Sequence, residues 1–278
     1  MPGTETRTLE QRRQHYEVER ELADRLRAAT KEQRRRLYTE VYDELFKRVP
    51  LHPRQSRQAA RHPRGEDVRE KLPIVRRFLN ETTMFLEVGS GDCAFATAVA
   101  DLVAHVVAID VSNQILRDDL LPENVQLVQS DGSSIPVEPG SVDVAYSDQL
   151  MEHVHPDDAV DQLRHLYAAL KRGGVYVCIT PNRLSGPHDI SGEFDAEATG
   201  LHLKEYTVGD LAALFRAVGF TKVRIIFGIR GRFMLLPTFP AVLCEQVLSL
   251  LPAGRRRAIA GKAPFRWLLG VQLAGFKD

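Results

Sequence analysis

The spacing of apolar residues changes near residue 82, and this change divides the chain into two kinds of structure. Before it, apolar side chains recur at every fourth position in two rows, which are Val18, Leu22 and Leu26, and then Tyr38, Tyr42 and Phe46. Such a repeat predicts amphipathic helix, here over residues 8–49, with Pro50 ending it. We interpret Tyr38 and Tyr42, together with Tyr16, as packing residues; the alternative is that they line an acceptor site.

After residue 82, short apolar runs alternate with amphipathic stretches. The runs that predict strands are 84–89, 105–110, 125–130, 142–147, 175–180, 222–228 and 267–276, and the stretches between them that predict helices are 93–103, 113–121 and 157–171. Strands that alternate with helices indicate a parallel sheet with helices on both faces, and nearly continuous apolar strands suit burial on both sides. The expected fold class is α/β, a doubly wound, mostly parallel, seven-stranded, Rossmann-like sheet.

One further helix has start and stop signals of its own. Thr207 with Asp210 three residues later resembles a capping box, and Gly219 is a typical helix end. These boundaries predict three regions: an N-terminal helical cap (1–80), a cofactor-binding core (81–228), and an apolar helical insertion with the final strand of the sheet (229–278).

Composition narrows the functional classes. The formal net charge is zero, so nothing about the whole chain favours nucleic acid. Residues 1–80 are basic, with 20 Lys and Arg against 13 Asp and Glu, and we expect them to dock on the acidic remainder. The three cysteines are an odd number at wide spacings, and the N-terminus lacks a signal-peptide pattern, so a reducing, cytoplasmic location is expected.

A glycine turn follows the first strand. Phe85 to Val88 run into Gly89, Ser90 and Gly91, and Asp110 ends the next strand about twenty residues later. Glycines here let the backbone bend sharply and let a ligand approach, while the carboxylate can accept hydrogen bonds from ribose hydroxyls. The same turn fits a dinucleotide fingerprint, so a nicotinamide-dependent oxidoreductase is one alternative.

Other polar residues favour a cationic ligand over a pyrophosphate. Glu87 precedes the first glycine and Asp92 follows the second, where they suit an amino group and a sulfonium charge. Asp131 and Gly132 end the third strand, where a carboxylate can accept from an adenine amino group. The fourth strand opens into a polar segment, 147–153, at the carboxyl edge of the sheet.

Taken together, these motifs resemble those of the class I S-adenosylmethionine-dependent methyltransferases, particularly small-molecule methyltransferases, over residues 82–228. The residues that the resemblance implies in cofactor binding are Glu87, Gly89, Gly91, Asp110, Asp131, Gly132 and Ser147. In this assignment the two glycines of the turn pass close to the methionine part, Asp110 holds the ribose and Asp131 reads the adenine. Cys93 stands where the family often has a third glycine, which we interpret as a modest change of pocket shape.

Histidines are the candidate catalytic groups. His153 follows the fourth strand and His202 lies in the long connection 181–206, so either can remove a proton from an acceptor hydroxyl. The segment after the fourth strand is not Asn-Pro-Pro-aromatic, which favours oxygen over nitrogen as the acceptor atom. The expected acceptor is a small metabolite, a sugar or a lipid-linked glycan. No metal is expected, because Glu152 and His153 match no common ligand spacing.

Residues 233–252 are long and apolar, but Pro237, Pro240 and Glu245 argue against a membrane-spanning helix. The segment is expected to be a pocket lid or a homodimer contact. With the arginines at 255–257, the alternative is a peripheral membrane contact through 233–257. A non-catalytic membrane-associated binding module is therefore a third hypothesis for the whole chain.

Overall fold

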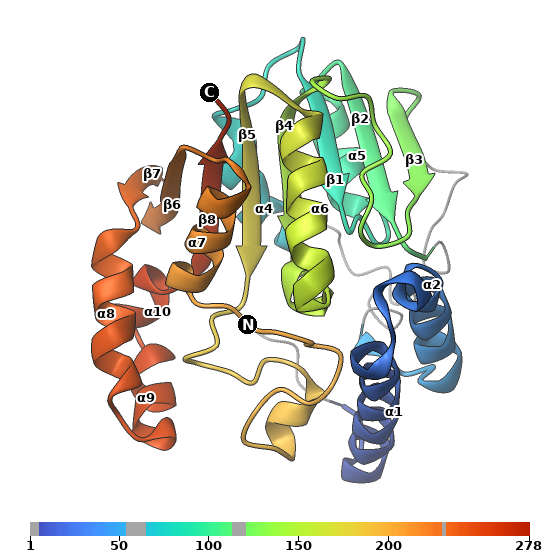
Figure 1. Cartoon of the computed structure of the whole chain (residues 1–278), viewed down its shortest axis with the longest axis vertical. Helices are drawn as coiled ribbons and strands as arrows, with labels where there is room; N and C mark the ends of the chain where they lie inside the picture. The colour runs from blue at the N-terminus through green and yellow to red at the C-terminus, as the bar shows by residue number, and fades with distance from the viewer. Residues whose placement is uncertain (1–5, 54–64, 113–120, 230–231) are drawn as a thin grey trace.

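The computed structural model describes residues 6–53, 65–112, 121–229 and 232–278, and a single twisted sheet lies at its centre (Figure 1). The strands follow the order β3-β2-β1-β4-β5-β8-β6-β7. Their bounds are β1 Met84–Val88, β2 His105–Asp110, β3 Val125–Gln129, β4 Val142–Asp148, β5 Leu170–Thr180, β6 Lys222–Ile229, β7 Arg232–Pro237 and β8 Val271–Phe276. The first five strands pair in parallel, and β8 runs antiparallel to both β5 and β6. The predicted α/β, Rossmann-like fold is confirmed.

The sheet has eight strands where seven were expected. The additional strand, β7, opens the apolar segment that was expected to be helical, and it pairs antiparallel with β6 at the edge of the sheet. The predicted strand 267–276 is also shorter, because residues 265–268 form a helical turn and only 271–276 pair with β5. A short apolar run can form either a helix or a strand, and pairing with a neighbouring strand decides which of the two it forms.

Helices cover both faces of the sheet (Figure 1). Their bounds are α1 Leu9–Ala28, α2 Lys31–Arg48, α4 Gly65–Arg76, α5 Ala94–Ala100, α6 Pro156–Ala169, α7 Val208–Val218, α8 Phe239–Ser249, α9 Ala253–Ala260 and α10 Phe265–Leu268. The predicted capping box at Thr207 and the stop at Gly219 are confirmed. The helix expected at 113–121 falls almost entirely on residues 113–120, outside the described residues.

The single helix expected over 8–49 is wrong, because the structure has two. Ala29 is extended, and Thr30 caps a second helix through a capping box with Gln33, as Thr8 caps the first. The apolar rows before and after the break keep the same four-residue phase, with Thr30 and Arg34 at the positions between them, so their period did not reveal it. The two helices share a core of their own that includes Leu22, Val41 and Leu201.

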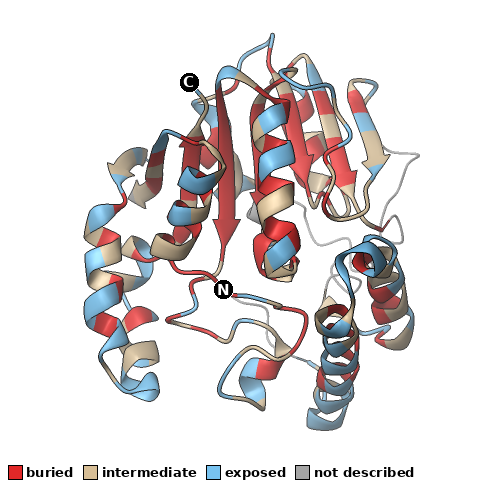
Figure 2. Cartoon of the chain, viewed as in Figure 1, coloured by how far each residue is buried: buried red, intermediate tan, exposed pale blue. Residues whose placement is uncertain are grey.

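The sheet separates two larger cores. One contains α6 and α7, where Tyr176 stacks on Phe215 with ring centroids 5.2 Å apart. The other lies under α4 and α5, where Phe95 stacks on Tyr146. The central strands are accordingly buried along almost their whole length (Figure 2). Among the described helices, none has the length and apolar composition needed to cross a bilayer.

A buried ion pair fixes the N-terminal helices to the sheet domain. Arg34 of α2 donates two hydrogen bonds to Asp158 of α6, at 2.6 and 2.9 Å, and their side chains are only 3% and 2% exposed. The Tyr38 hydroxyl donates to the same carboxylate at 2.8 Å. Asp158 is therefore held almost entirely by groups from α2.

Replacing Arg34 with alanine should strongly destabilise the protein, because Asp158 would be left buried without its cation. We expect the free energy of unfolding, measured by urea denaturation, to fall by about 3–5 kcal/mol. Arg48→Ala on the same helix is the matched control. Arg48 pairs with Glu21 and Glu44 nearer the surface, and its loss should cost no more than about 1 kcal/mol. Equal losses for the two variants would contradict the buried contact.

Candidate functional site

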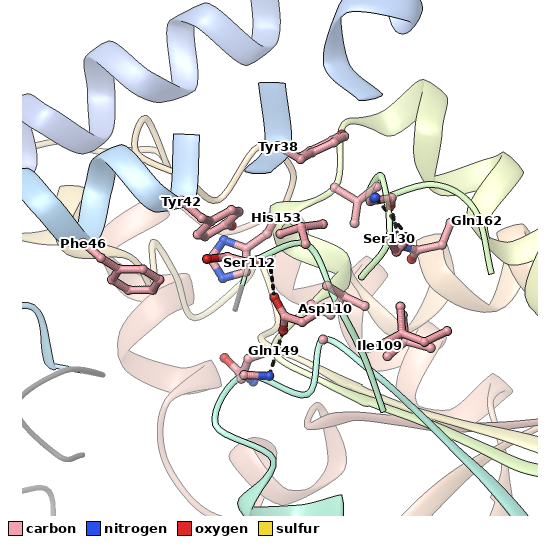
Figure 3. Close-up of a pocket in the computed structure, with 17 residues that line it drawn as sticks. Tyr38, Tyr42, Phe46, Ile109, Asp110, Ser112, Ser130, Gln149, His153 and Gln162 are labelled. Atoms are coloured by element: carbon pink, nitrogen blue, oxygen red, sulfur yellow. Dashed lines mark hydrogen bonds between the residues drawn. The ribbon is translucent and has the colours of Figure 1, made fainter. Parts of the chain in front are cut away.

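A pocket lies at the carboxyl ends of β1, β2 and β4, beneath α2 (Figure 3). It holds about 720 Å³ of empty space, part of it open to solvent. Its lining residues are Tyr38, Tyr42, Phe46, Val88, Gly89, Gly91, Ile109, Asp110, Val111, Ser112, Ser130, Gly132, Gln149, Leu150, His153, Val154 and Gln162. Open α/β sheets bind ligands at this edge.

The glycine turn forms one wall of the pocket. The N–H groups of Gly89 and Ser90 both donate to the carbonyl of Ile109, at 2.8 and 3.1 Å, which ties the turn to the end of β2. Gly89 and Gly91 both have positive φ angles, 79° and 53°. A side chain at Gly89 would also press on Leu150, whose Cδ1 lies 3.0 Å from the position that a Cβ would take. The turn therefore needs glycine for its backbone and for its space.

Cys93 ends the turn in the left-handed region, with φ 57°, and it serves as the N-cap of α5 without a side-chain cap. Left-handed backbone favours glycine, which gives a physical reason for a third glycine at this place in related turns. The thiol is buried, and burial raises its pKa to about 11. Cys93 therefore acts as a packing residue under the turn.

Asp110 lies on the rim of the pocket and holds two loops in place. One carboxylate oxygen accepts from the Gly91 N–H at 2.7 Å, and the other accepts from the Ser112 N–H at 3.1 Å (Figure 3). A carboxylate offers about four acceptor positions, so it can accept from several donors at once. Asp110 thus combines a structural role with the ability to bind hydroxyl groups.

Asp131 does not line the pocket, although its neighbours Ser130 and Gly132 do. Burial alone would raise the pKa of Asp131, but the backbone N–H and hydroxyl groups of Ser133 and Ser134 outweigh it and lower the pKa. One of its oxygens is occupied by these bonds. The carboxylate therefore shapes the loop after β3 and leaves the pocket wall to its neighbours.

Gly132 lies directly against the ring of Tyr38. A Cβ at this glycine would come within 2.7 Å of the Tyr38 ring, and φ is +83°. Gln162 of α6 donates to the Gly132 carbonyl at 2.7 Å and holds the loop from below. The expectation that Tyr38 and Tyr42 serve packing alone is therefore incomplete, because both line the pocket. Tyr16 lies elsewhere, stacked on Phe194 and bonded to Asp195.

Acidic and phenolic groups are buried beneath the glycine turn. Three polar atoms there have no hydrogen-bond partner within the described part of the chain: Glu87 Oε2, Tyr146 Oη and Asp148 Oδ1. Burial, reinforced by Asp148, Asp92 and Asp110, raises the pKa of Glu87 well above its usual value. A cation bound beside these groups would reverse that shift and provide a missing partner. The arrangement therefore fits a ligand that carries an amino group.

Ser147 does not face the pocket. Its side chain is fully buried, and its hydroxyl shares a 2.6 Å hydrogen bond with the Tyr176 hydroxyl inside the core. The pocket wall after β4 is instead made by Gln149 and Leu150. Gln149 has φ 53°, and this left-handed kink turns the chain toward the pocket. No feature of the sequence marked that kink in advance.

The two predicted catalytic histidines lie side by side. Their rings meet edge to face with centroids 4.8 Å apart, and His153 also lies 6.1 Å from the Tyr42 ring (Figure 3). His153 lines the pocket, whereas His202 is buried behind it. His153 Nδ1 lies 3.0 Å from the carbonyl of Leu201. A carbonyl only accepts, so Nδ1 is the donor and Nε2 is the basic nitrogen.

His202 is held by a carboxylate. Its Nδ1 lies 2.8 Å from Glu205. Burial alone would lower the pKa of His202, but Glu205, Glu152 and Asp189 outweigh it and the pKa is raised. His202 is therefore a favourable site for positive charge next to the ring of His153.

Within the described residues, two clusters of side chains could each hold a cation. Glu152, His153 and His202 form one, and His15, Glu19 and His52 form the other; within each, the ligand atoms lie within 4.8 Å of one another. Sequence spacing did not indicate either cluster, because one member of each comes from a distant segment. The first cluster borders the pocket through His153.

A family model described as a methyltransferase domain matches residues 86–178. A "probable S-adenosylmethionine-dependent methyltransferase" of Mycobacterium tuberculosis is 26% identical over 191 residues, covering 68% of this chain and 65% of that protein. A protein of the same description from Mycolicibacterium smegmatis is 26% identical over 136 residues, covering 49% and 51%. The chain thus spans about half to two thirds of the length of these curated relatives.

Solved structures share the fold. The Haloferax volcanii protein solved with the methyltransferase activator Trm112 superposes with a TM-score of 0.55 at 16% identity, covering 80% of this chain and 97% of that one. Phosphoethanolamine N-methyltransferase 2 of Haemonchus contortus gives a TM-score of 0.52 at 16% identity, covering 76% and 53%. The family model, the sequence relatives and the fold agree with the glycine turn and the rim carboxylate. Residues 86–178 thus match a methyltransferase domain, and the chain is similar in sequence and in fold to S-adenosylmethionine-dependent methyltransferases of class I.

Proposed function

We propose that this chain transfers a methyl group from S-adenosylmethionine to an oxygen atom of a small metabolite, a sugar or a lipid-linked glycan. The observation that carries the proposal is the pocket itself. The glycine turn and Asp110 form one wall, and a histidine with a defined basic nitrogen, His153, lies in the same cavity.

The geometry supports a specific placement of the cofactor. Gly89 and Gly91 would hold the methionine part, and the buried Glu87 carboxyl beneath the turn would be the partner for its amino group. Asp110 would accept from the ribose hydroxyls. Gly132 and Tyr38 would hold the adenine, while Asp131 shapes the loop that carries Gly132. When bound, the cofactor supplies a methyl group activated by a sulfonium.

His153 serves as the general base in this proposal. Its Nδ1 proton is fixed by the Leu201 carbonyl, so Nε2 can take the proton of an acceptor hydroxyl. His202 contacts the ring of His153 and acts as a positioning residue, itself oriented by Glu205. Tyr42 and Phe46 line the same side of the pocket and exclude water from the reacting atoms.

Oxygen is favoured over nitrogen by two features. A base is most useful for a hydroxyl, whose proton must leave during transfer. In addition, the segment after β4 runs Ser147, Asp148, Gln149 and Leu150, with no Asn-Pro-Pro-aromatic motif. An acceptor screen with hydroxylated and amino compounds separates the two chemistries.

The cofactor assignment is tested by calorimetric titration with S-adenosylhomocysteine and, separately, with NAD. We expect saturable binding of the first and no binding of the second. Asp110→Asn should raise the Kd for S-adenosylhomocysteine roughly five- to 150-fold, which is about 1–3 kcal/mol for a hydrogen bond to a charged group. Asp101→Asn, an exposed aspartate at the end of α5, is the matched control and should bind normally. Binding of NAD alone would refute the proposal.

The catalytic assignment is tested with His153→Ala. Loss of a general base should lower the turnover number by about a hundredfold or more while the Kd for S-adenosylhomocysteine stays within about twofold. His165→Ala, an exposed histidine on α6, is the control and should keep full turnover. Full turnover in His153→Ala would remove this residue from the chemistry.

Dialysis against EDTA tests whether the histidines act through a metal. We expect turnover to be unchanged, because the proposal requires no cation. Loss of turnover that is restored by a divalent metal would assign Glu152, His153 and His202 to metal binding and contradict the role of His153 as a base.

A further inference from the structure

Helix α8 presents an apolar face to solvent. The residues on it are Phe239, Leu243, Val247 and the C-cap Leu250, with exposed fractions of 68%, 58%, 58% and 84%. At about 100° of rotation per residue, their spacing confines them to an arc of about 80° on one side of the helix. A contiguous stripe of this kind differs from the isolated exposed apolar residues that are normal on protein surfaces.

The orientation of α8 is fixed by its opposite face. Glu245 is buried there and accepts hydrogen bonds from Asn182 Nδ2 at 2.8 Å and from the N–H groups of Val208 and Gly209 at 2.7 and 3.0 Å. Ala241 and Leu248 are buried on the same side. The helix therefore cannot rotate to bury the stripe without breaking three hydrogen bonds to a carboxylate.

The apolar exposure continues onto neighbouring elements and does not belong to the pocket. Met234 of β7 and Trp267 of α10 are also about half exposed. Of the eight large apolar residues exposed in the described chain, six lie between 234 and 267, so the exposure is concentrated on this part of the surface. None of these residues lines the pocket, which does not support the expected role of the segment as a pocket lid.

Basic residues follow the stripe in the sequence and lie on α9, on α10 and in the turn between these two helices. They are Arg255, Arg256 and Arg257 of α9, then Lys262 and Arg266. Helices α8, α9 and α10 share a small core that includes Leu248, Ala260 and Leu269, so these residues belong to one unit (Figure 1). Glu245, which is buried, is the only acidic residue between 232 and 270. No ion pair joins any of the five basic residues to an acidic group elsewhere in the described residues.

We propose that the surface formed by α8, α9 and α10 docks on an anionic lipid bilayer. The apolar stripe enters the boundary between headgroups and acyl chains, and the exposed Arg255, Lys262 and Arg266 bind lipid phosphates. Arg257 is half-buried and donates to the Ala196 carbonyl. Charge decides between this partner and a second copy of the chain. A two-fold contact through α8, α9 and α10 would bring the same basic residues of two copies together, and these helices carry no exposed acidic residue to offset them. An anionic surface supplies the complementary charge.

The proposal is tested by co-sedimentation of the full chain with large vesicles. We expect binding to vesicles of phosphatidylglycerol and phosphatidylcholine, and little binding to phosphatidylcholine alone. Leu243→Glu/Val247→Glu should abolish binding. The triple variant Arg255→Ser/Lys262→Ser/Arg266→Ser should lower the partition coefficient about tenfold or more. Each basic residue near an anionic surface contributes to the free energy of membrane binding. Leu9→Glu, the same substitution at an exposed leucine of α1, is the matched control and should bind normally.

Titration with S-adenosylhomocysteine shows that each variant is folded, so loss of vesicle binding is distinguished from loss of structure. Failure of the wild-type chain to bind anionic vesicles would overturn the proposal, as would equal binding of the Leu243→Glu/Val247→Glu variant. Light scattering provides the third outcome. A wild-type dimer that becomes monomeric in that variant, without vesicle binding, would overturn the lipid proposal and identify the face as a contact between copies.

Discussion

The pocket depends on the buried contact between Arg34, Tyr38 and Asp158. Three groups of α2 line the pocket, namely Tyr38, Tyr42 and Phe46, and that helix is held over the sheet edge by this contact. The Asp158 side chain is only 2% exposed, so loss of its cation would strongly destabilise the folded state. The ring of Tyr38 is in turn pressed against Gly132, where no larger residue fits. The N-terminal helices are consequently part of the site itself.

Carboxylates with similar sequence signatures have different roles because their surroundings differ. Asp110 lies on the pocket rim, where two backbone N–H groups hold its carboxylate. Asp131 is occupied by Ser133 and Ser134 and shapes a loop. Glu87 is buried, and the pKa of its carboxyl is raised by burial and by neighbouring carboxylates. Of the three, the last is the most responsive to a bound cation.

Two groups of helices lie at opposite ends of the sheet and have different proposed roles. Helices α1 and α2 lie beyond the β3 end of the sheet and close over the cavity, while α8, α9 and α10 lie at the β7 end (Figure 1). Glu245 of α8 accepts hydrogen bonds from the first N–H groups of α7. These bonds fix the orientation of α8, so its apolar side faces outward. Chemistry and surface attachment are therefore proposed for separate regions, joined by the rigid sheet between them.

Features that rest on local bonds and local periodicity could be read from the amino-acid sequence, and distant contacts could not. Five parallel strands, the glycine turn, the carboxylate of Asp110, and the helix from Thr207 to Gly219 were all predicted, because neighbouring residues decide them. The break at Thr30 was not predicted because the apolar rows before and after it keep the same four-residue phase. Strand β7 could not be distinguished from helix without its partner β6. Packing alone brought His202 to His153 and Tyr38 to Gly132, and it turned Ser147 toward the Tyr176 hydroxyl in the core. Such contacts depend on the strand order and on the angle at which helices pack. Both follow from the burial of whole helix and sheet faces, so no short segment of sequence predicts these contacts.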